Sequence, residues 1–210
     1  MPSGAPGPVI PEVYAQALGD DDPIVVLSET PYLLRKLTKG LTEKQLAKSP
    51  APGKWSIKQI VAHLADGEVV LGSRYRFVAA QDRPALAGYD QDAFVANLGV
   101  GNATTQDLLD DFALVRAANI GLLMRLPAEA FDRVGLHSER GEESIAKMVA
   151  MYAGHDRHHL RQIETIRVGL FPAKGKAARK PARKVTRKAV PKAARRASAG
   201  KAPGRAKRRG

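Results

Sequence analysis

Apolar residues recur at helical spacing in four stretches of the chain, whereas no segment between them alternates apolar and polar residues convincingly, as a half-buried strand does. Residues typical of helix starts precede three of the stretches: Asp22 followed by Pro23, the capping-box pair Ser56 and Gln59, and Thr104. The pattern predicts main helices over residues 23–40, 57–81, 104–126 and 143–168, with a short helical turn at 42–47.

Four amphipathic helices of this length indicate an all-α domain, a four-helix bundle over residues 22–171. Residues 1–21 are rich in proline and glycine, and we expect a flexible N-terminal segment there. The connections on either side of the third helix are each about 20 residues long, which permits crossovers, so the bundle topology stays open. The first of them contains the sequence GYDQD, and Tyr89, Asp90 and Asp92 could border a cleft.

The positive charge of the protein is concentrated in its last 39 residues. The formal net charge is +13, but residues 172–210 hold 16 of the 34 Lys and Arg and none of the 21 Asp and Glu. The first 171 residues therefore carry 18 basic against 21 acidic side chains, a net charge of −3. Because residues 172–210 also lack aromatic residues, we expect a disordered basic tail.

A basic tail of this kind can neutralise phosphates and so bind DNA or RNA without sequence preference. The residues expected to make such contacts are Lys180, Arg183, Lys184, Arg187, Lys188, Arg195 and Arg196. The alternative is a solvated polycation that only raises solubility.

The absence of cysteine limits the chemistry that the chain can carry. It excludes disulfides, thiolate metal sites and a cysteine nucleophile, so that any metal ligand must be His, Asp or Glu. No window resembles a membrane span or a signal peptide, so we expect a cytoplasmic protein without membrane contact.

The histidines of the second and fourth helices are candidate metal ligands. On the fourth helix His159 lies within the apolar stripe, His155 lies on its shoulder and His158 is turned away. The i, i+4 spacing of His155 and His159 places two imidazoles one turn apart on one face, and His63 of the second helix could add a third. The alternative is that each histidine is satisfied separately or that the three on the fourth helix form a surface cluster.

Several other side chains are candidates to surround such a site. Glu68 and Asp156 point toward buried faces and need partners, which could be Arg74, Arg76 or the second ring nitrogen of a ligand histidine. The candidates for the layer behind the ligands are Glu68, Asp156 and His158. We expect Trp55 to close the end of the bundle as a core residue, rather than to form an aromatic wall, and His137 to face water from a loop.

Four segments give the chain a resemblance to the DinB-like (DinB/YfiT-like) family over about residues 22–170: PAPGKWSIKQIVAHLADGE, LGSRYRF, GYDQD and GHDRHHLRQIETIR. The resemblance implies a four-helix bundle, often dimeric, that binds a divalent metal through one histidine of the second helix and a His-x-x-x-His pair of the fourth. By position these ligands are His63, His155 and His159.

The resemblance leaves the activity open, because similar proteins include thiol-dependent transferases and isomerases using mycothiol or bacillithiol. We expect a metal-dependent enzyme acting on a small molecule, with zinc or nickel as the first choices and iron as a further one. A thiol transferase is the leading hypothesis. The alternatives are a metal-dependent hydrolase and a noncatalytic metal-binding module held on nucleic acid by the tail.

The tail hypothesis makes a direct prediction. Removal of residues 172–210 should abolish retention of the protein on immobilised DNA at low salt, because those residues carry its excess positive charge. Elution position along a salt gradient would measure the effect. Unchanged retention of the truncated protein would contradict the assignment.

Overall fold

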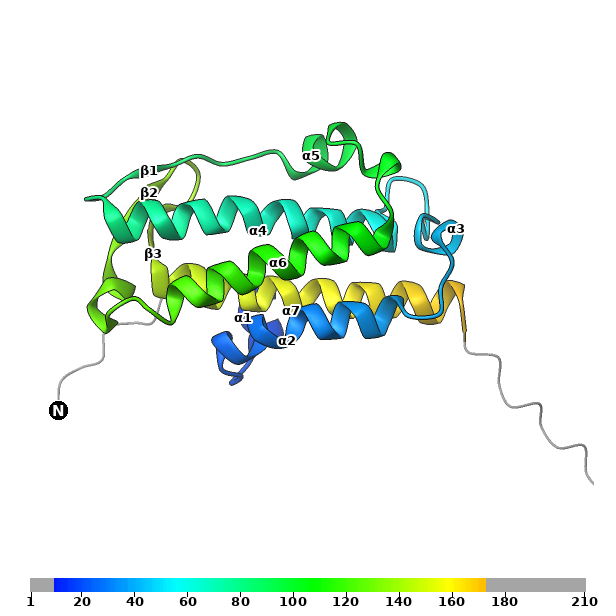
Figure 1. Ribbon diagram of the computed structural model, residues 1–210, viewed down its shortest axis with the longest axis horizontal. Coiled ribbons are helices and arrows are strands. Elements are labelled where there is room, and N and C mark those ends of the chain that lie inside the picture. Colours follow the sequence, from blue (N-terminus) through cyan, green and yellow to red (C-terminus); the bar gives the residue numbers. More distant parts are fainter. Residues whose placement is uncertain (1–9, 173–210) are drawn as a thin grey trace, which may run out of the picture. The chain divides into compact units, whose positions relative to one another are not determined.

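Four long helices form the core of the protein. The computed structural model describes residues 10–172, and the basic positions between Lys180 and Arg196 that were assigned to nucleic-acid binding lie outside them. The long helices are α2 (Pro23–Thr38), α4 (Ile57–Ala80), α6 (Thr105–Leu123) and α7 (Ile145–Leu170), and they pack as a four-helix bundle (Figure 1). The predicted all-α bundle is confirmed, and its helix starts lie within about two residues of the predicted ones.

The helix starts are set by the side chains that the sequence indicated. Asp22 accepts a hydrogen bond from the backbone N–H of Ile24 at 2.8 Å. Ser56 and Gln59 bond reciprocally across the first turn of α4, at 3.2 Å and 2.9 Å. These caps satisfy backbone donors that would otherwise have no partner inside the helix.

Shorter elements complete the described part of the chain. They comprise the helices α1 (Glu12–Leu18), α3 (Glu43–Leu46) and α5 (Gln91–Asn97) and the 3₁₀ helices η1 (Val100–Asn102) and η2 (Ala128–Asp132). A sheet of order β1-β2-β3 is made by β1 (Ala85–Leu86), β2 (Val134–His137) and β3 (Gly141–Ser144), with β1 parallel and β3 antiparallel to β2. The expectation of no strands was wrong, because strands of two to four residues are too short to show alternation.

The topology differs from a simple up-and-down bundle. Helices α4 and α6 run in the same direction, and α2 and α7 run together in the opposite one (Figure 1). The chain between α4 and α6, which contains β1 and α5, therefore returns along the length of the bundle (Figure 1). The connection between α6 and α7 instead folds into β2 and β3 at one end, so only the first of the two long connections is a crossover.

Two apolar clusters fill the bundle on either side of a polar layer. One cluster joins the second half of α4 to the first half of α7, with Leu71, Tyr75 and Met148 fully buried. The other joins the first half of α4 to the second half of α7, around Ile60 and Ile163. The middle of the bundle is left to buried charged and polar side chains.

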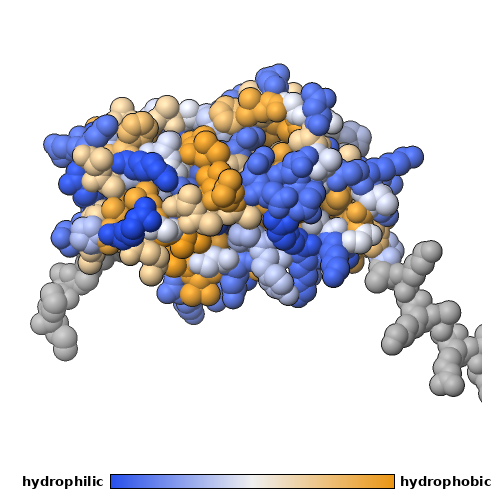
Figure 2. All heavy atoms as spheres, in the orientation of Figure 1, coloured by the Kyte–Doolittle hydropathy of each residue, from blue (hydrophilic) through white to orange (hydrophobic). Residues whose placement is uncertain are grey.

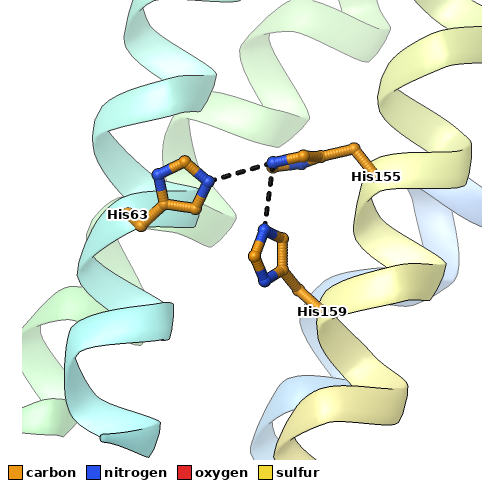
Figure 3. A group of neighbouring side chains, drawn as sticks. All are labelled: His63, His155 and His159. Carbon is orange, nitrogen blue, oxygen red and sulfur yellow. Dashed lines mark hydrogen bonds between the residues drawn. The ribbon is translucent and has the colours of Figure 1, made fainter. Parts of the chain in front are cut away.

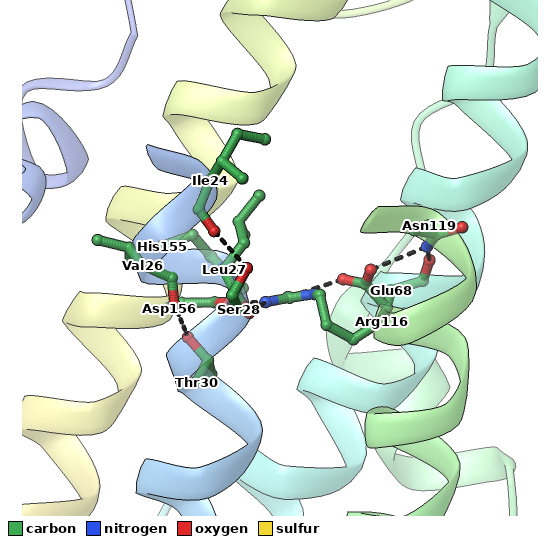
Figure 4. A network of polar contacts seen from close by, with 10 residues as sticks. All are labelled: Ile24, Val26, Leu27, Ser28, Thr30, Glu68, Arg116, Asn119, His155 and Asp156. Atoms are coloured by element: carbon green, nitrogen blue, oxygen red, sulfur yellow. Dashed lines mark hydrogen bonds and ion pairs between the residues drawn. The ribbon is translucent and has the colours of Figure 1, made fainter. Parts of the chain in front are cut away.

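Arg116 of α6 is the centre of this polar layer (Figure 4). Its guanidinium donates to Glu68 of α4 and to Asp156 of α7, each at 2.7 Å, and to the carbonyl oxygen of Leu27 at 2.8 Å. Asn119 donates a further bond to Glu68 at 2.8 Å. The two carboxylates pair with an arginine, as expected, but that arginine is Arg116 of α6 and not Arg74 or Arg76.

The surface of the bundle carries exposed apolar side chains, gathered near the middle of the face shown in Figure 2. The more exposed of those on the bundle helices include Val25, Tyr32, Val69 and Leu114. None of the helices between residues 10 and 172 combines the length and the apolar run that crossing a membrane requires. The homodimer expected from the resemblance stays a prediction.

The Arg116 network predicts a large stability effect. Arg116→Met should lower the free energy of unfolding by about 3–5 kcal/mol, because two buried carboxylates lose their counterion together. Arg35→Met, which removes an ion pair with the exposed Asp110, is the matched control and should change stability little. Urea denaturation compares the two variants, and equal stabilities would contradict the role given to Arg116.

Candidate metal centre

Three histidine side chains from two helices converge between α4 and α7 (Figure 3). His155 Nε2 lies 3.0 Å from Nε2 of His63 and 3.1 Å from Nε2 of His159. One ring nitrogen from each residue lies within 4.8 Å of the other two. The structure thus brings together the three histidines that the sequence singled out.

The helices hold these rings in the protein interior. His63 and His159 are 2% and 7% exposed, and the side chain of His155 is 12% exposed. His155 and His159 stand one turn apart on α7, as the i, i+4 spacing requires. His63 faces them from α4, which the sequence could not place next to α7.

Burial keeps the three imidazoles neutral. Desolvation, followed by the neighbouring His159, lowers the pKa of His63 to about 3, and desolvation lowers the pKa of His159 to about 4. The pKa of His155 is held well below its usual value by burial and then by His159 and His63. At neutral pH all three rings therefore offer lone pairs, the state in which imidazole binds a metal.

The proton positions favour a cation between the rings. The Gln162 carbonyl oxygen lies 2.9 Å from Nδ1 of His159, which places the proton on Nδ1 and a lone pair on Nε2. His155 Nε2 carries either one proton or one lone pair, yet it lies within hydrogen-bond distance of two nitrogens, Nε2 of His63 and Nε2 of His159. The contacts cannot all be hydrogen bonds unless that one proton is shared, whereas a divalent cation bound at about 2.0–2.1 Å would give all three Nε2 atoms a partner. The donor set fits such an ion.

The candidates for the layer behind the ligands lie in different relations to the histidines. Asp156 Oδ1 is 4.0 Å from Nδ1 of His155, beyond hydrogen-bond distance, and both atoms are buried without another partner. Glu68 lies in the Arg116 network. His158 stacks edge-on against His159 and Tyr14, with ring centroids 5.4 Å and 5.9 Å away.

Two aromatic residues enclose the histidines from outside the four long helices. The Trp55 ring lies 4.9 Å from the ring of His63 and stacks on that of His159 at 6.5 Å. Its expected role as a core residue was thus incomplete, because Trp55 packs on an apolar cluster and also forms a wall of the site. Tyr14 of α1 lies edge-on to His155 at 5.3 Å, and no sequence signal indicated it.

Glycine at position 154 allows α1 to reach the site. A Cβ atom at Gly154 would overlap the backbone carbonyl of Tyr14, so a side chain there would displace α1 from α7. The close approach brings Tyr14 against His155, one residue further along α7. Helix α1 lies in the segment for which the sequence predicted no helix, since its stability depends on this docking.

A cavity of about 400 Å³ adjoins the histidines. His63 and His155 line it together with Tyr89 and Asp90, as expected for the GYDQD loop, whereas Asp92 lines a neighbouring hollow beside Trp55 and His159. The expectation for His137 was wrong: it lies in β2 and is 4% exposed, and its Nδ1 accepts a hydrogen bond from the Glu139 N–H at 3.1 Å.

Comparison with known proteins places this fold and site among relatives. YfiT from Bacillus subtilis superposes with a TM-score of 0.66 over 80% of this chain and 91% of its own, at 23% identity. Its structure is described as "a probable metal-dependent hydrolase with an unusual four-helix bundle topology". That likeness agrees with the fold seen here.

Sequence relatives extend the comparison. Two proteins of Oceanobacillus iheyensis named "Putative metal-dependent hydrolase" are 27% and 28% identical over 131 and 140 residues. These matches cover 62% and 67% of this chain and 75% and 81% of theirs. The family model of the DinB superfamily matches residues 27–163, a span that includes all three histidines. The chain therefore belongs to the DinB superfamily.

Proposed function

We propose that the protein is a divalent-metal-dependent enzyme that activates a small nucleophile at His63, His155 and His159 for attack on a small molecule. The observation that carries the proposal is the convergence of three neutral imidazoles at a cavity of about 400 Å³. Three protein ligands leave a coordination position open, as in catalytic rather than structural zinc sites. Zinc or nickel suits this donor set best, and iron also accepts imidazole.

A bound cation would supply Lewis-acid chemistry, lowering the pKa of a coordinated water to about 7 or deprotonating a coordinated thiol. The protein's own residues provide the setting for it. Gln162 fixes the tautomer of His159, and Trp55 and Tyr14 cover the rings on their open sides. The low exposure of the site strengthens electrostatic interactions within it.

Thiol transfer is the first candidate reaction. Among the described residues, which include every Asp and Glu of the chain, only Asp156 has a carboxylate within 4.0 Å of these histidines. Its other oxygen is bound to Arg116. A thiol that coordinates the metal would be deprotonated there, and since the chain has no cysteine the thiol would be a small molecule of the mycothiol or bacillithiol type.

Hydrolysis is the second candidate, and the names of the relatives favour it. A noncatalytic module, metal-stabilised and attached to nucleic acid by residues 172–210, is the third. Enzyme and module differ in what the metal does. The two apolar clusters of the bundle do not include the histidines, so the proposal expects the fold to persist without metal.

Ligand substitution tests the proposal. His63→Ala and His159→Ala should reduce the metal content from about one ion per chain to near zero, because two imidazoles cannot hold the ion as three do. Both should lose turnover of 1-chloro-2,4-dinitrobenzene with bacillithiol or mycothiol. Elemental analysis of protein purified without a histidine tag, followed by the assay, gives both quantities.

The matched control is His158→Ala. It removes an imidazole that lies next to His159 but is not part of the cluster of His63, His155 and His159. It should keep its metal and its turnover. Removal of metal by chelation should abolish turnover and shift the melting temperature by less than about 5 °C. If the metal-loaded protein shows no turnover and chelation lowers its stability strongly, the result would favour the noncatalytic module. Turnover of ester substrates in the absence of thiol would favour the hydrolase.

The neutrality of the imidazoles predicts a pH dependence. The folded-state pKa values of His63 and His159, about 3 and about 4, lie below the usual value of about 6.5. At pH values between the folded-state and the unfolded-state pKa of each histidine, the unfolded chain binds more protons than the folded one. The free energy of unfolding of metal-free protein should therefore fall as the pH decreases from about 6.5, by up to about 1.4 kcal/mol per pH unit for each histidine.

Urea denaturation at several pH values measures this slope. His63→Ala provides the comparison, because it removes one of the titrating groups and should fall less steeply. Equal slopes for the parent and this variant would contradict the neutral state assigned to His63.

A further inference from the structure

A second buried arginine lines the cavity, and it has no carboxylate partner. Arg74 of α4 is 3% exposed. Its guanidinium donates to the hydroxyl oxygen of Tyr152 at 3.1 Å and to the carbonyl oxygen of Ala87 at 2.6 Å, while its Nε is buried without a partner. No carboxylate of the described residues, which contain all those of the chain, forms an ion pair with it.

The contrast with Arg116 shows what is missing at Arg74. Both guanidinium groups are 2–3% exposed, and Arg116 is neutralised by two carboxylates at 2.7 Å. A buried cation without a counterion is costly unless hydrogen bonds and an opposite charge compensate it. At Arg74 two neutral oxygen acceptors provide only part of that compensation, so the cavity next to it is suited to an anion.

Tyrosine hydroxyls provide further donors in the same cavity. Tyr14, Tyr89 and Tyr152 all line it. Burial raises the pKa of each, that of Tyr89 to about 12, so all three hydroxyls keep their protons at neutral pH. Tyr152 accepts its bond from Arg74, which leaves its own proton free to donate to a ligand.

The other charged groups of the cavity limit how much negative charge a ligand can bring. Arg140 is engaged by Glu143 through two bonds, at 2.6 Å and 3.0 Å. Asp90 caps α5 through the backbone N–H groups of Asp92 and Ala93, and Glu139 also lines the cavity. Because Asp90 and Glu139 already bring two negative charges to the cavity, a ligand with one negative charge that pairs with Arg74 meets less repulsion than a phosphate dianion.

We propose that the substrate carries a carboxylate, which binds to Arg74 and the hydroxyl of Tyr152 while the reacting end of the molecule lies at the histidines. Arg74, His63 and His155 line one cavity, so a single small molecule can reach both. The inference rests on the proposed function in that it assigns a substrate class to the same site. Arg74 acts as a binding residue that sets specificity and orientation.

Calorimetric titration of the full-length, zinc-loaded protein with 3-phenylpropionate and with its neutral amide tests this subsite. The parent protein should bind the acid about 10-fold or more tightly than the amide, because charge-assisted hydrogen bonds are stronger than neutral ones. Arg74→Met should remove that preference, and Arg74→Lys should restore part of it.

Two further variants separate binding from folding. Arg76→Met is the matched control, because Arg76 lies on the same helix but donates to Asn119 and Gly72, and it should keep the full preference. Tyr152→Phe keeps the ring and should reduce the preference for the acid several-fold. It tests the subsite even if Arg74→Met fails to fold. Full preference in folded Arg74→Met or in Tyr152→Phe would overturn the subsite.

The zinc content of the same samples distinguishes this proposal from the one on which it rests. If the protein takes up no zinc but still shows an acid preference that depends on Arg74, the result would support the subsite and count against the metal centre. Zinc at one ion per chain with no acid preference would support the metal centre and overturn the subsite. Preference that persists in Arg74→Met and disappears on zinc removal would show direct coordination of the carboxylate, which also overturns the subsite.

Discussion

The interaction on which the bundle depends is the burial of one guanidinium between two carboxylates. Arg116 joins α6 to Glu68 of α4, to Asp156 of α7 and to the backbone of α2 at Leu27, and so contacts each of the other three long helices. Buried ions tolerate little displacement, because each lost contact exposes a charge to a low dielectric. This network therefore fixes the rotation of α4 and α7 about their axes.

That rotation has a direct consequence for the histidines. His155 precedes Asp156 on α7, and His63 lies five residues before Glu68 on α4. When the two carboxylates turn toward Arg116, the imidazoles turn into the cleft on the other side of the polar layer. The same rotation of α4 and α7 thus positions both the charged layer and the candidate metal centre, with an apolar cluster on either side.

The walls of the site come from segments outside the four helices. The loop before α4 supplies Trp55, helix α1 supplies Tyr14 across Gly154, and the crossover between α4 and α6 supplies Tyr89. Loops vary more easily than packed helices, so the lining of the cavity can change without loss of the histidine cluster. Arg74 differs from these residues, because it belongs to the rigid part of α4 and keeps its place when loops change.

The sequence by itself determined the four helices, their caps and the inward direction of His155 and His159, because these depend on local periodicity and backbone hydrogen bonding. It also indicated His63 as a third ligand, which the resemblance supported, and the GYDQD loop as a border of the cleft. Only the tertiary structure decided that α4 lies beside α7, that Arg116 neutralises Glu68 and Asp156, and that Trp55 and Tyr14 enclose the rings. These contacts join residues far apart in the chain, where periodicity carries no information. The strands were not predicted because they are too short to show alternation, and α1 was not predicted because its stability comes from docking on α7.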